Sequence, residues 1–232
     1  MCPISTLTAA NLRSPFMCAS VFEVKTSADL MTAKSMNYSG SIFLEMAASE
    51  YISRIRFGKT LKKMAECQHA LLHEATEKGF KVCVLLTSSL TCKYEGNYIS
   101  PLQIAEEMQV CLQLGADSII LEEAAPGLTP RMMENICKTL PLSHVPPKVV
   151  VFSLRNNGDT TLHCVGVAMA LGYERFVIHS LPRPSVNPHQ IGEPLSAAQL
   201  AEMILEIPGH ESEKKQLLRE CSQFNEEHAS LI

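Results

Sequence analysis

The sequence predicts an α/β protein built on a parallel β-sheet. The chain has 232 residues, enough for one domain with a sizeable core. Short, continuous apolar runs alternate with helical patterns along almost the whole chain. Continuous runs are typical of strands that are covered on both faces, as in parallel sheets. The repeat predicts a TIM barrel or a doubly wound sheet, and periodicity alone does not choose between them.

Six apolar runs are the expected strands. They occupy residues 16–19, 41–44, 82–86, 118–121, 149–154 and 176–178. Each of the last five is followed by a helical pattern, as β-α units require. No linker or low-complexity segment divides the chain.

The helices between the strands carry sequence signals at their ends. Ser100, followed by Pro101 and Gln103, predicts an N-cap, a first-turn proline and a capping box. Thr129 predicts the same kind of start for a helix that ends near Leu140. Further helices are expected from the apolar stripe of residues 61–75, from Ser196 and in the charged tail, and helix ends from Gly79, Gly115 and Gly172.

Composition excludes several classes of function. The formal net charge is -4 and no basic block exists, which argues against nucleic acid as the main partner. No apolar run approaches the roughly 20 residues needed to span a bilayer, so no membrane partner is expected. The first 22 residues contain no acid and one arginine, a weak resemblance to a mitochondrial transit peptide. We therefore expect a cytoplasmic protein, with a mitochondrial location as the alternative.

Cysteines and histidines give little indication of chemistry outside the strand ends. The nine cysteines are odd in number and include no C-x-x-C pair, which favours reduced, buried thiols over a disulfide scaffold. His69 and His73 are spaced i, i+4 like a two-histidine metal site. The order His-Glu-x-x-His is absent, so a solvated helix face is the better interpretation.

Several motifs follow one another in a distinctive order. Residues 47–50 read Ala-Ala-Ser-Glu, residues 92–96 read Cys-Lys-Tyr-Glu-Gly, and residues 120–130 end in Leu-Thr-Pro. These segments resemble A-A-S-E, C-P-Y-E-G and S-L-G-D-T-I-G-V-G-T-P of the hydroxymethylglutaryl-CoA lyase family, the DRE-TIM metallolyases. The similarity runs over about residues 15–205. It implies a TIM barrel and, for the family, metal-dependent retro-aldol cleavage of an acyl-CoA.

By the same resemblance the chain begins at the family's third strand. Two β-α units of about 30 residues each cannot precede it. We therefore expect about six of the eight units and an incomplete barrel, from a truncated gene product or a chain that closes its edges by other pairing. The expected division is an N-terminal segment (1–14), a partial barrel (15–210) and a charged helix or tail (211–232).

The resemblance also places apolar residues where the family binds its metal. The family strand ends in His-x-His-Asp, and the corresponding residues here are Phe152, Leu154 and Arg155. The family's glycine-rich loop with a catalytic cysteine corresponds to residues 181–186, which contain no cysteine. Loss of one such group commonly slows a reaction about 10²-fold. We therefore expect neither a Mg²⁺ or Mn²⁺ cofactor nor ordinary lyase activity.

TIM-barrel sites lie at the C-terminal ends of the strands, which selects the candidate residues. Glu123, at the position of a family aspartate, could bind or polarise a carbonyl with Arg155, although an ion pair between strand ends is the more ordinary interpretation. Glu122 and Glu123 should face opposite sides of the sheet. The candidates are catalytic Glu123, Arg155 and His179, and substrate-binding Glu45, Thr87, Ser88, Ser89 and Asn156.

Three functions follow as hypotheses. The first is a lyase-like protein without metal-dependent activity that binds an acyl-CoA or small carboxylate, or partners a full-length homologue. The second is an active enzyme, a carbon–carbon lyase or other acyl-CoA enzyme of altered chemistry, in a specialised pathway. The third is the family reaction, rescued by a partner chain that supplies the missing strands. Exposed parallel edges also predict an oligomer.

Overall fold

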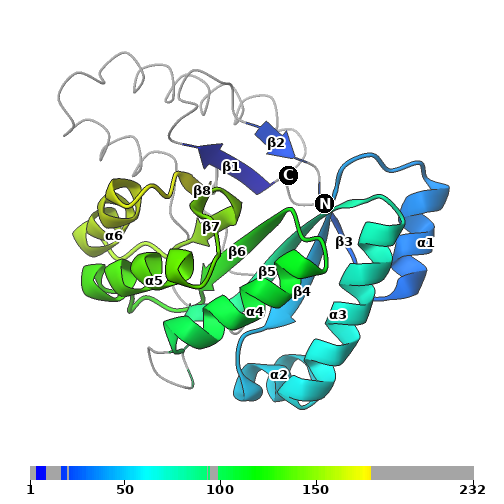
Figure 1. The fold of residues 1–232 in the computed structure, drawn as a ribbon, viewed down its shortest axis with the longest axis horizontal. Helices are drawn as coiled ribbons and strands as arrows, with labels where there is room; N and C mark the ends of the chain where they lie inside the picture. The colour runs from blue at the N-terminus through cyan, green and yellow to red at the C-terminus, as the bar shows by residue number, and fades with distance from the viewer. Residues whose placement is uncertain (1–3, 9–16, 20, 93, 95–98, 179–232) are drawn as a thin grey trace.

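A computed structural model describes residues 4–8, 17–19, 21–92, 94 and 99–178 (Figure 1). Its eight strands are β1 (Ile4–Thr8), β2 (Met17–Ala19), β3 (Val21–Glu23), β4 (Ser41–Ala47), β5 (Lys81–Thr91), β6 (Ser118–Glu123), β7 (Val150–Ser153) and β8 (Arg175–Ile178). They form one sheet in the order β2-β1-β8-β7-β6-β5-β4-β3. The predicted helix from Ser196 and the tail at 211–232 lie outside the described residues, and the division into three segments stays a prediction.

The sheet confirms the predicted α/β class. Strands β3 to β8 are parallel neighbours in chain order, and β4 to β8 correspond to the last five of the six expected strands. The first expected strand, at residues 16–19, corresponds to β2, which pairs antiparallel with β1 instead of joining the parallel series. The sheet is open, because β2 and β3 occupy the two ends of the strand order. Strand β1 was not predicted from the sequence; it pairs antiparallel with both β8 and β2. Strand β3 was not predicted either, because at three residues it is too short to form a recognisable apolar run.

The two outermost strands are consecutive in the chain. Strand β2 ends at Ala19 and β3 begins at Val21, so one residue separates the opposite ends of the strand order. Two peptide units span at most about 7.6 Å between Cα atoms. The first and last strands are therefore held close by covalent bonds.

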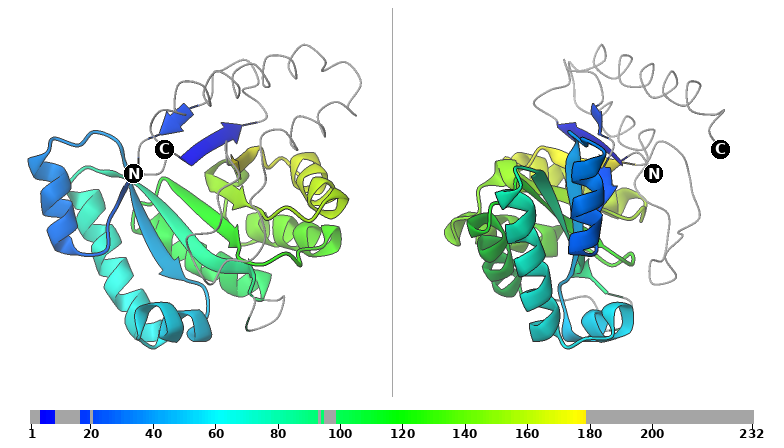
Figure 2. Two further views of the ribbon diagram at one scale, coloured as in Figure 1. Left: turned by 180° about the vertical axis from the view of Figure 1, so that it is seen from behind. Right: turned by 90° about the vertical axis from the view of Figure 1, so that its right-hand side faces the viewer.

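Within the described ranges, six α-helices accompany the strands. They are α1 (Ser27–Ser35), α2 (Glu50–Phe57), α3 (Leu61–Glu77), α4 (Pro101–Gln113), α5 (Pro130–Leu142) and α6 (Asp159–Ala170). Figures 1 and 2 show α3, α4 and α5 over the same face of the sheet. No helix in the described ranges has the length and apolar character needed to cross a membrane.

Most of the predicted helix signals are confirmed. Thr129 caps α5, because its Oγ1 accepts a hydrogen bond from the backbone N–H of Met132 at 3.3 Å. Gly79, Gly115 and Gly172 follow helices with φ of 82°, 96° and 86°, which favours glycine. The predicted capping box at Ser100 is wrong, since its side chain makes no capping bond. Pro101 in the first turn is enough to begin α4 there.

Alternation along the strands gives the sheet two different faces. The helix face packs Ile119, Leu121 and Phe152 into the main core beneath the helices. The inner face is the opposite one and carries a smaller apolar cluster that includes Ile120 and Val151. Successive side chains of a strand point to opposite faces, so these residues define which strand-end side chains point inward.

Candidate functional site

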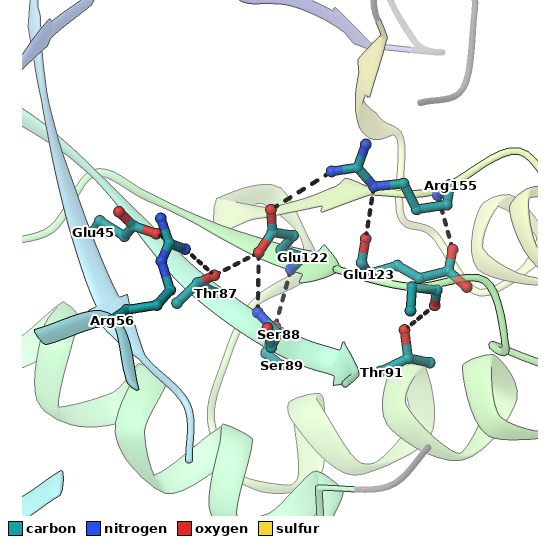
Figure 3. A network of polar contacts seen from close by, with 10 residues as sticks. Glu45, Arg56, Thr87, Ser88, Ser89, Thr91, Glu122, Glu123 and Arg155 are labelled. Atoms are coloured by element: carbon teal, nitrogen blue, oxygen red, sulfur yellow. Dashed lines mark hydrogen bonds and ion pairs between the residues drawn. The ribbon is translucent and has the colours of Figure 1, made fainter. Parts of the chain in front are cut away.

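The inner face changes from apolar to polar near the C-terminal ends of the strands. Glu45, Thr87, Glu122 and Ser153 each lie two residues beyond an inner-face position of β4, β5, β6 or β7. Figure 3 shows the first three close together, with Arg155 approaching from beyond β7. The expected region for a TIM-barrel site thus holds a network of charged groups and hydroxyls.

The Ala-Ala-Ser-Glu motif builds the helix that delivers a further cation. Ser49 caps α2, since its Oγ accepts from the N–H of Ile52 at 3.2 Å. Glu50 accepts from the N–H of Leu61 at 2.7 Å and so joins α2 to the start of α3. Arg56 lies in the last turn of α2 and points toward the strand ends (Figure 3). Arg56 was not predicted from the sequence, because no local pattern separates it from a surface arginine.

Arg56 joins two strand ends. Its Nη1 forms an ion pair with Glu45 Oε1 and donates a hydrogen bond to Thr87 Oγ1 at 2.9 Å. The side chains of Glu45 and Arg56 are 14% and 18% exposed, so solvent reaches both. Burial raises the pKa of the Glu45 carboxyl, and the charge of Arg56 partly offsets this effect. Glu45 is therefore an accessible carboxyl that releases its proton less readily than an ordinary glutamate.

Glu122 occupies the centre of the network. Its Oε2 accepts from the hydroxyl of Thr87 at 2.6 Å and from the N–H of Ser88 at 3.0 Å. Its own N–H donates to Ser89 Oγ at 3.0 Å. On the other side, Oε1 lies 3.9 Å from Arg155 Nη2, and both side chains are buried. The predicted binding residues Thr87, Ser88 and Ser89 are thus gathered around Glu122.

An irregularity in β5 makes this arrangement possible. The pairing of β5 with β6 shifts in register between Leu86 and Thr91. Within this stretch Ser88 has φ of 56°, which is uncommon for a residue other than glycine. The bulge lets three consecutive residues of one strand contact the same glutamate, which regular alternation would prevent.

Glu123 is bound to backbone N–H groups, and its predicted catalytic role stays a prediction. Its Oε1 accepts from the N–H groups of Gly127 and Leu128, each at 3.0 Å, and Oε2 accepts from the N–H of Arg155 at 2.8 Å. The carboxylate therefore ties the loop after β6 to the end of β7. Burial raises the pKa of Glu123, and the three backbone hydrogen bonds oppose this shift.

The expected ion pair between the side chains of Glu123 and Arg155 is wrong. The Nε of Arg155 donates to the carbonyl oxygen of Glu123 at 3.1 Å, and its guanidinium faces Glu122 instead. The cause is the alternation of side chains along β6, which points Glu122 and Glu123 to opposite faces of the sheet. The sequence predicted this difference between the two glutamates. Burial lowers the pKa of Arg155, while Glu122 and then Glu123 act in the opposite direction.

Phe152 and Leu154 do not face the inner side of the sheet. Both are buried in the core on the helix face, and the ring of Phe152 lies 5.5 Å from that of Tyr173 and 6.0 Å from that of Phe176. The inner-face neighbour on β7 is Ser153, beside Glu122. Phe152 and Leu154, the residues expected to correspond to the metal-binding histidines, therefore point into the core on the helix face.

The metal of the resembled family does not fit the described strand ends. Mg²⁺ and Mn²⁺ need several oxygen ligands with unneutralised charge. Glu45 is paired with Arg56, and Glu122 faces Arg155 and accepts two hydrogen bonds. Within the described ranges, no three potential metal ligands converge at this edge of the sheet.

A cluster of potential metal ligands does occur between α3 and α4. His69, Glu107 and Cys111 place their ligand atoms within 4.8 Å of one another, and His69 Nε2 lies 2.7 Å from Glu107 Oε1. Burial, reinforced by Glu107, raises the pKa of the Cys111 thiol to about 12. A neutral thiol is a poor metal ligand, so the cluster is better explained as a helix–helix contact.

The remaining predicted site residues are separate from the network. Asn156 Oδ1 accepts from the N–H of Gly158 at 3.0 Å, which forms a local turn before α6. Thr161 Oγ1 donates to the carbonyl of Arg155 at 2.7 Å and so holds the loop that carries this arginine. The predicted acid or base His179 lies outside the described residues.

Known structures share this arrangement of strands and helices. The hydroxymethylglutaryl-CoA lyase of Brucella melitensis superposes with a TM-score of 0.70 at 18% identity, over 82% of this chain and 66% of that one. The Bacillus subtilis enzyme gives 0.71 at 15% identity, over 90% and 70%. The chain has the fold of the hydroxymethylglutaryl-CoA lyases. The resemblance noted in the sequence is therefore confirmed in the fold.

Two further comparisons concern ligands and sequence. The lyase of Acinetobacter baumannii, solved with coenzyme A and 3-methylmalate, gives a TM-score of 0.69 at 17% identity, over 89% of this chain and 67% of that one. The (R)-citramalyl-CoA lyase of Chloroflexus aurantiacus is 25% identical over 134 residues. That match covers 57% of this chain and 41% of the lyase. No family model matches the chain.

Proposed function

We propose that this chain is a member of the hydroxymethylglutaryl-CoA lyase superfamily that binds an acyl-CoA or a small carboxylate without metal-dependent lyase chemistry. The observation that carries the proposal is the network at the strand ends. The guanidinium groups of Arg56 and Arg155 lie near the C-terminal strand ends, where TIM-barrel sites are found, and guanidinium matches carboxylate in geometry and charge.

The energetics of the network also favour a binding role. Burying ion pairs is often no more stabilising than packing apolar residues of the same volume. Charges retained at the open end of a sheet therefore suggest a ligand-binding role. Arg56 and Glu45 are partly exposed and can meet a ligand from solvent, whereas Glu122 and Arg155 lie deeper. A carboxylate ligand could displace Glu45 from Arg56, because the raised pKa of Glu45 lets it take up a proton.

The relatives suggest the chemical class of ligand. One is a lyase of citramalyl-CoA, and another was solved with coenzyme A and the dicarboxylate 3-methylmalate. We therefore propose an acyl-CoA or free acid with a terminal carboxylate as the ligand of this chain.

Calorimetric titration and a turnover assay test this proposal. The purified chain is titrated with 3-hydroxy-3-methylglutaryl-CoA and with citramalyl-CoA, each with Mg²⁺ or EDTA, and acyl-CoA cleavage products are measured in parallel. We expect binding that does not depend on Mg²⁺, weakened about tenfold or more by Arg56→Met, and no cleavage product. Metal-dependent release of acetoacetate or pyruvate would contradict the proposal, as would the absence of binding.

Glu45 favours a second candidate, an enzyme of altered chemistry. A partly exposed carboxyl with a raised pKa, beside a cation, is suited to proton transfer. The reaction would be carbon–carbon cleavage or another conversion of an acyl-CoA thioester. Metal-independent turnover that Glu45→Gln abolishes, with binding retained, would establish this candidate over the first.

The open strand order supports association with another chain as a third candidate. Strands β2 and β3 each have one neighbour in the sheet. Backbone groups at such edges can pair with a second copy or with a full-length homologue. Light scattering across protein concentrations tests this candidate, and a monomer throughout, unchanged by a co-purified homologue, would exclude it.

A further inference from the structure

A small cavity opens beside the network, between the end of β3, strand β4 and helix α3. Its volume is about 160 Å³, which is below the roughly 300 Å³ of typical sites for drug-sized ligands. Phe57, Met64 and Leu71 form an apolar wall. Glu45 lines the cavity and also belongs to the network at the strand ends, whereas the other lining residues form no hydrogen bond or ion pair with that network in the described structure. The cavity has room for a molecule of a few carbon atoms.

A buried side chain in this cavity lacks a hydrogen-bond partner. Gln68 on α3 is 8% exposed, and its Oε1 is buried without a partner in the described structure. Such groups are rare, because a buried acceptor that loses water without gaining a donor is destabilising. Gln68 lines the cavity, so a donor bound there can satisfy it.

The cavity also carries an available positive charge. Lys59 lines it and makes no ion pair within the described residues; its Nζ lies 3.6 Å from Cys67 Sγ. Lys25 lines it too, but is paired with Glu23 at 3.1 Å. The charge of Glu45 is matched by Arg56. A ligand therefore meets a net positive lining.

We propose that this cavity binds a short-chain hydroxy acid. Its carboxylate contacts Lys59, its hydroxyl donates to Gln68 Oε1, and its hydrocarbon chain packs against Phe57, Met64 and Leu71. Each group satisfies one feature of the cavity: the unpaired cation, the unpaired acceptor and the apolar wall. This site is additional to the proposed acyl-CoA site and does not depend on it.

Two acids that differ only in the hydroxyl group test the proposal. The chain is titrated with 3-hydroxybutyrate and with butyrate, and affinities are measured by calorimetry or ligand-observed NMR. The hydroxy acid should bind about tenfold more tightly, since it alone satisfies Gln68. Equal affinities, or no binding of either acid, would overturn the proposal. Equal affinities are the result expected if a water molecule already donates to Gln68 Oε1.

Three variants assign the contacts. Gln68→Leu should remove the preference for the hydroxy acid while retaining butyrate binding, and its core packing should be preserved because leucine leaves no unpaired acceptor. Lys59→Met should weaken both acids about five- to tenfold. Lys62→Met, at an exposed lysine in the first turn of α3 that does not line the cavity, is the matched control and should change neither affinity. A preference that survives in Gln68→Leu would refute the assignment, and the wild-type comparison stands even if a variant fails to fold.

Discussion

The hydroxyl of Thr87 lies 2.6 Å from Glu122 Oε2 and donates a hydrogen bond to it. The Oγ1 atom of Thr87 also accepts a hydrogen bond from Arg56 Nη1 at 2.9 Å. One threonine therefore links the ion pair of Glu45 with Arg56 to the pair of Glu122 with Arg155. Since Thr87 is 1% exposed, water does not readily replace these bonds.

Replacing this hydroxyl should weaken the whole network. Thr87→Val keeps the shape but removes one hydrogen bond from Glu122 and one from Arg56, so we expect a loss of about 2 kcal/mol in the free energy of unfolding. Chemical denaturation measures the change. Thr87→Ser is the control, because it restores the hydroxyl and should recover most of the stability. Equal losses in both variants would show that packing, not hydrogen bonding, is responsible.

Arg155 should be needed mainly because Glu122 is buried beside it. Arg155→Met leaves that carboxylate without its cation and should reduce the free energy of unfolding by about 3 kcal/mol. Adding Glu122→Gln should recover part of this loss, which a double-mutant cycle measures. Strictly additive losses would mean that the 3.9 Å contact contributes no stabilisation.

The variant Glu123→Gln distinguishes an anchoring role of Glu123 from the catalytic role that the sequence suggested. Glu123→Gln puts an amide NH₂ group against backbone N–H donors, so a loss of about 2 kcal/mol in unfolding free energy is expected. Thermal and urea unfolding give this quantity. If the variant instead kept full stability and lost only a measured turnover, the catalytic role would be supported.

Histidine at position 152 should fail to create a metal site. Phe152 points into the core on the helix face, and Phe152→His should destabilise the chain by about 3 kcal/mol or more without binding Co²⁺. Absorption spectroscopy with Co²⁺ and urea unfolding measure the two effects. Ser153→His, on the inner face beside Glu122, is the comparison and should be better tolerated. Tight Co²⁺ binding by Phe152→His would show that this strand presents its other face inward.

Stability should depend on pH through Glu45. Burial raises the pKa of this carboxyl above its ordinary value of 4.5, so the folded chain keeps the proton at pH values where the unfolded chain releases it. The contribution of Glu45 to the free energy of unfolding is therefore greatest below about pH 4.5 and is lost as pH rises through the raised pKa. Glu45→Gln removes the titration. The difference, wild type minus variant, should fall with rising pH in urea titrations; a constant or rising difference would contradict this.

Most of the fold could be predicted from local sequence patterns. Buried parallel strands such as β6 are continuous apolar runs in the sequence. Pro101 and Pro130 mark the first turns of α4 and α5, the helical position that tolerates proline. Strand β1 could not be predicted, because its pairing with β8 joins residues about 170 positions apart. Ser196 and the charged tail were not tested.

The candidate site was predicted less completely, for a physical reason. Strand ends selected Glu45, Thr87 and Arg155, since parallel strands bring their C-terminal ends to one edge. Which face each side chain takes depends on the register of the strands and on the bulge at Ser88, which one sequence does not reveal. For this reason Glu123 was predicted as the partner of the Arg155 side chain, whereas the structure shows Glu122.

The single residue between Ala19 and Val21 has a mechanical consequence. A barrel normally joins its first and last strands through hydrogen bonds that can slide or separate. Here a short stretch of backbone holds the outermost strands together, and covalent bonds do not fray. The end of β2 and the start of β3 can therefore separate no further than two peptide units allow, whatever happens to the hydrogen bonds along the two outer edges.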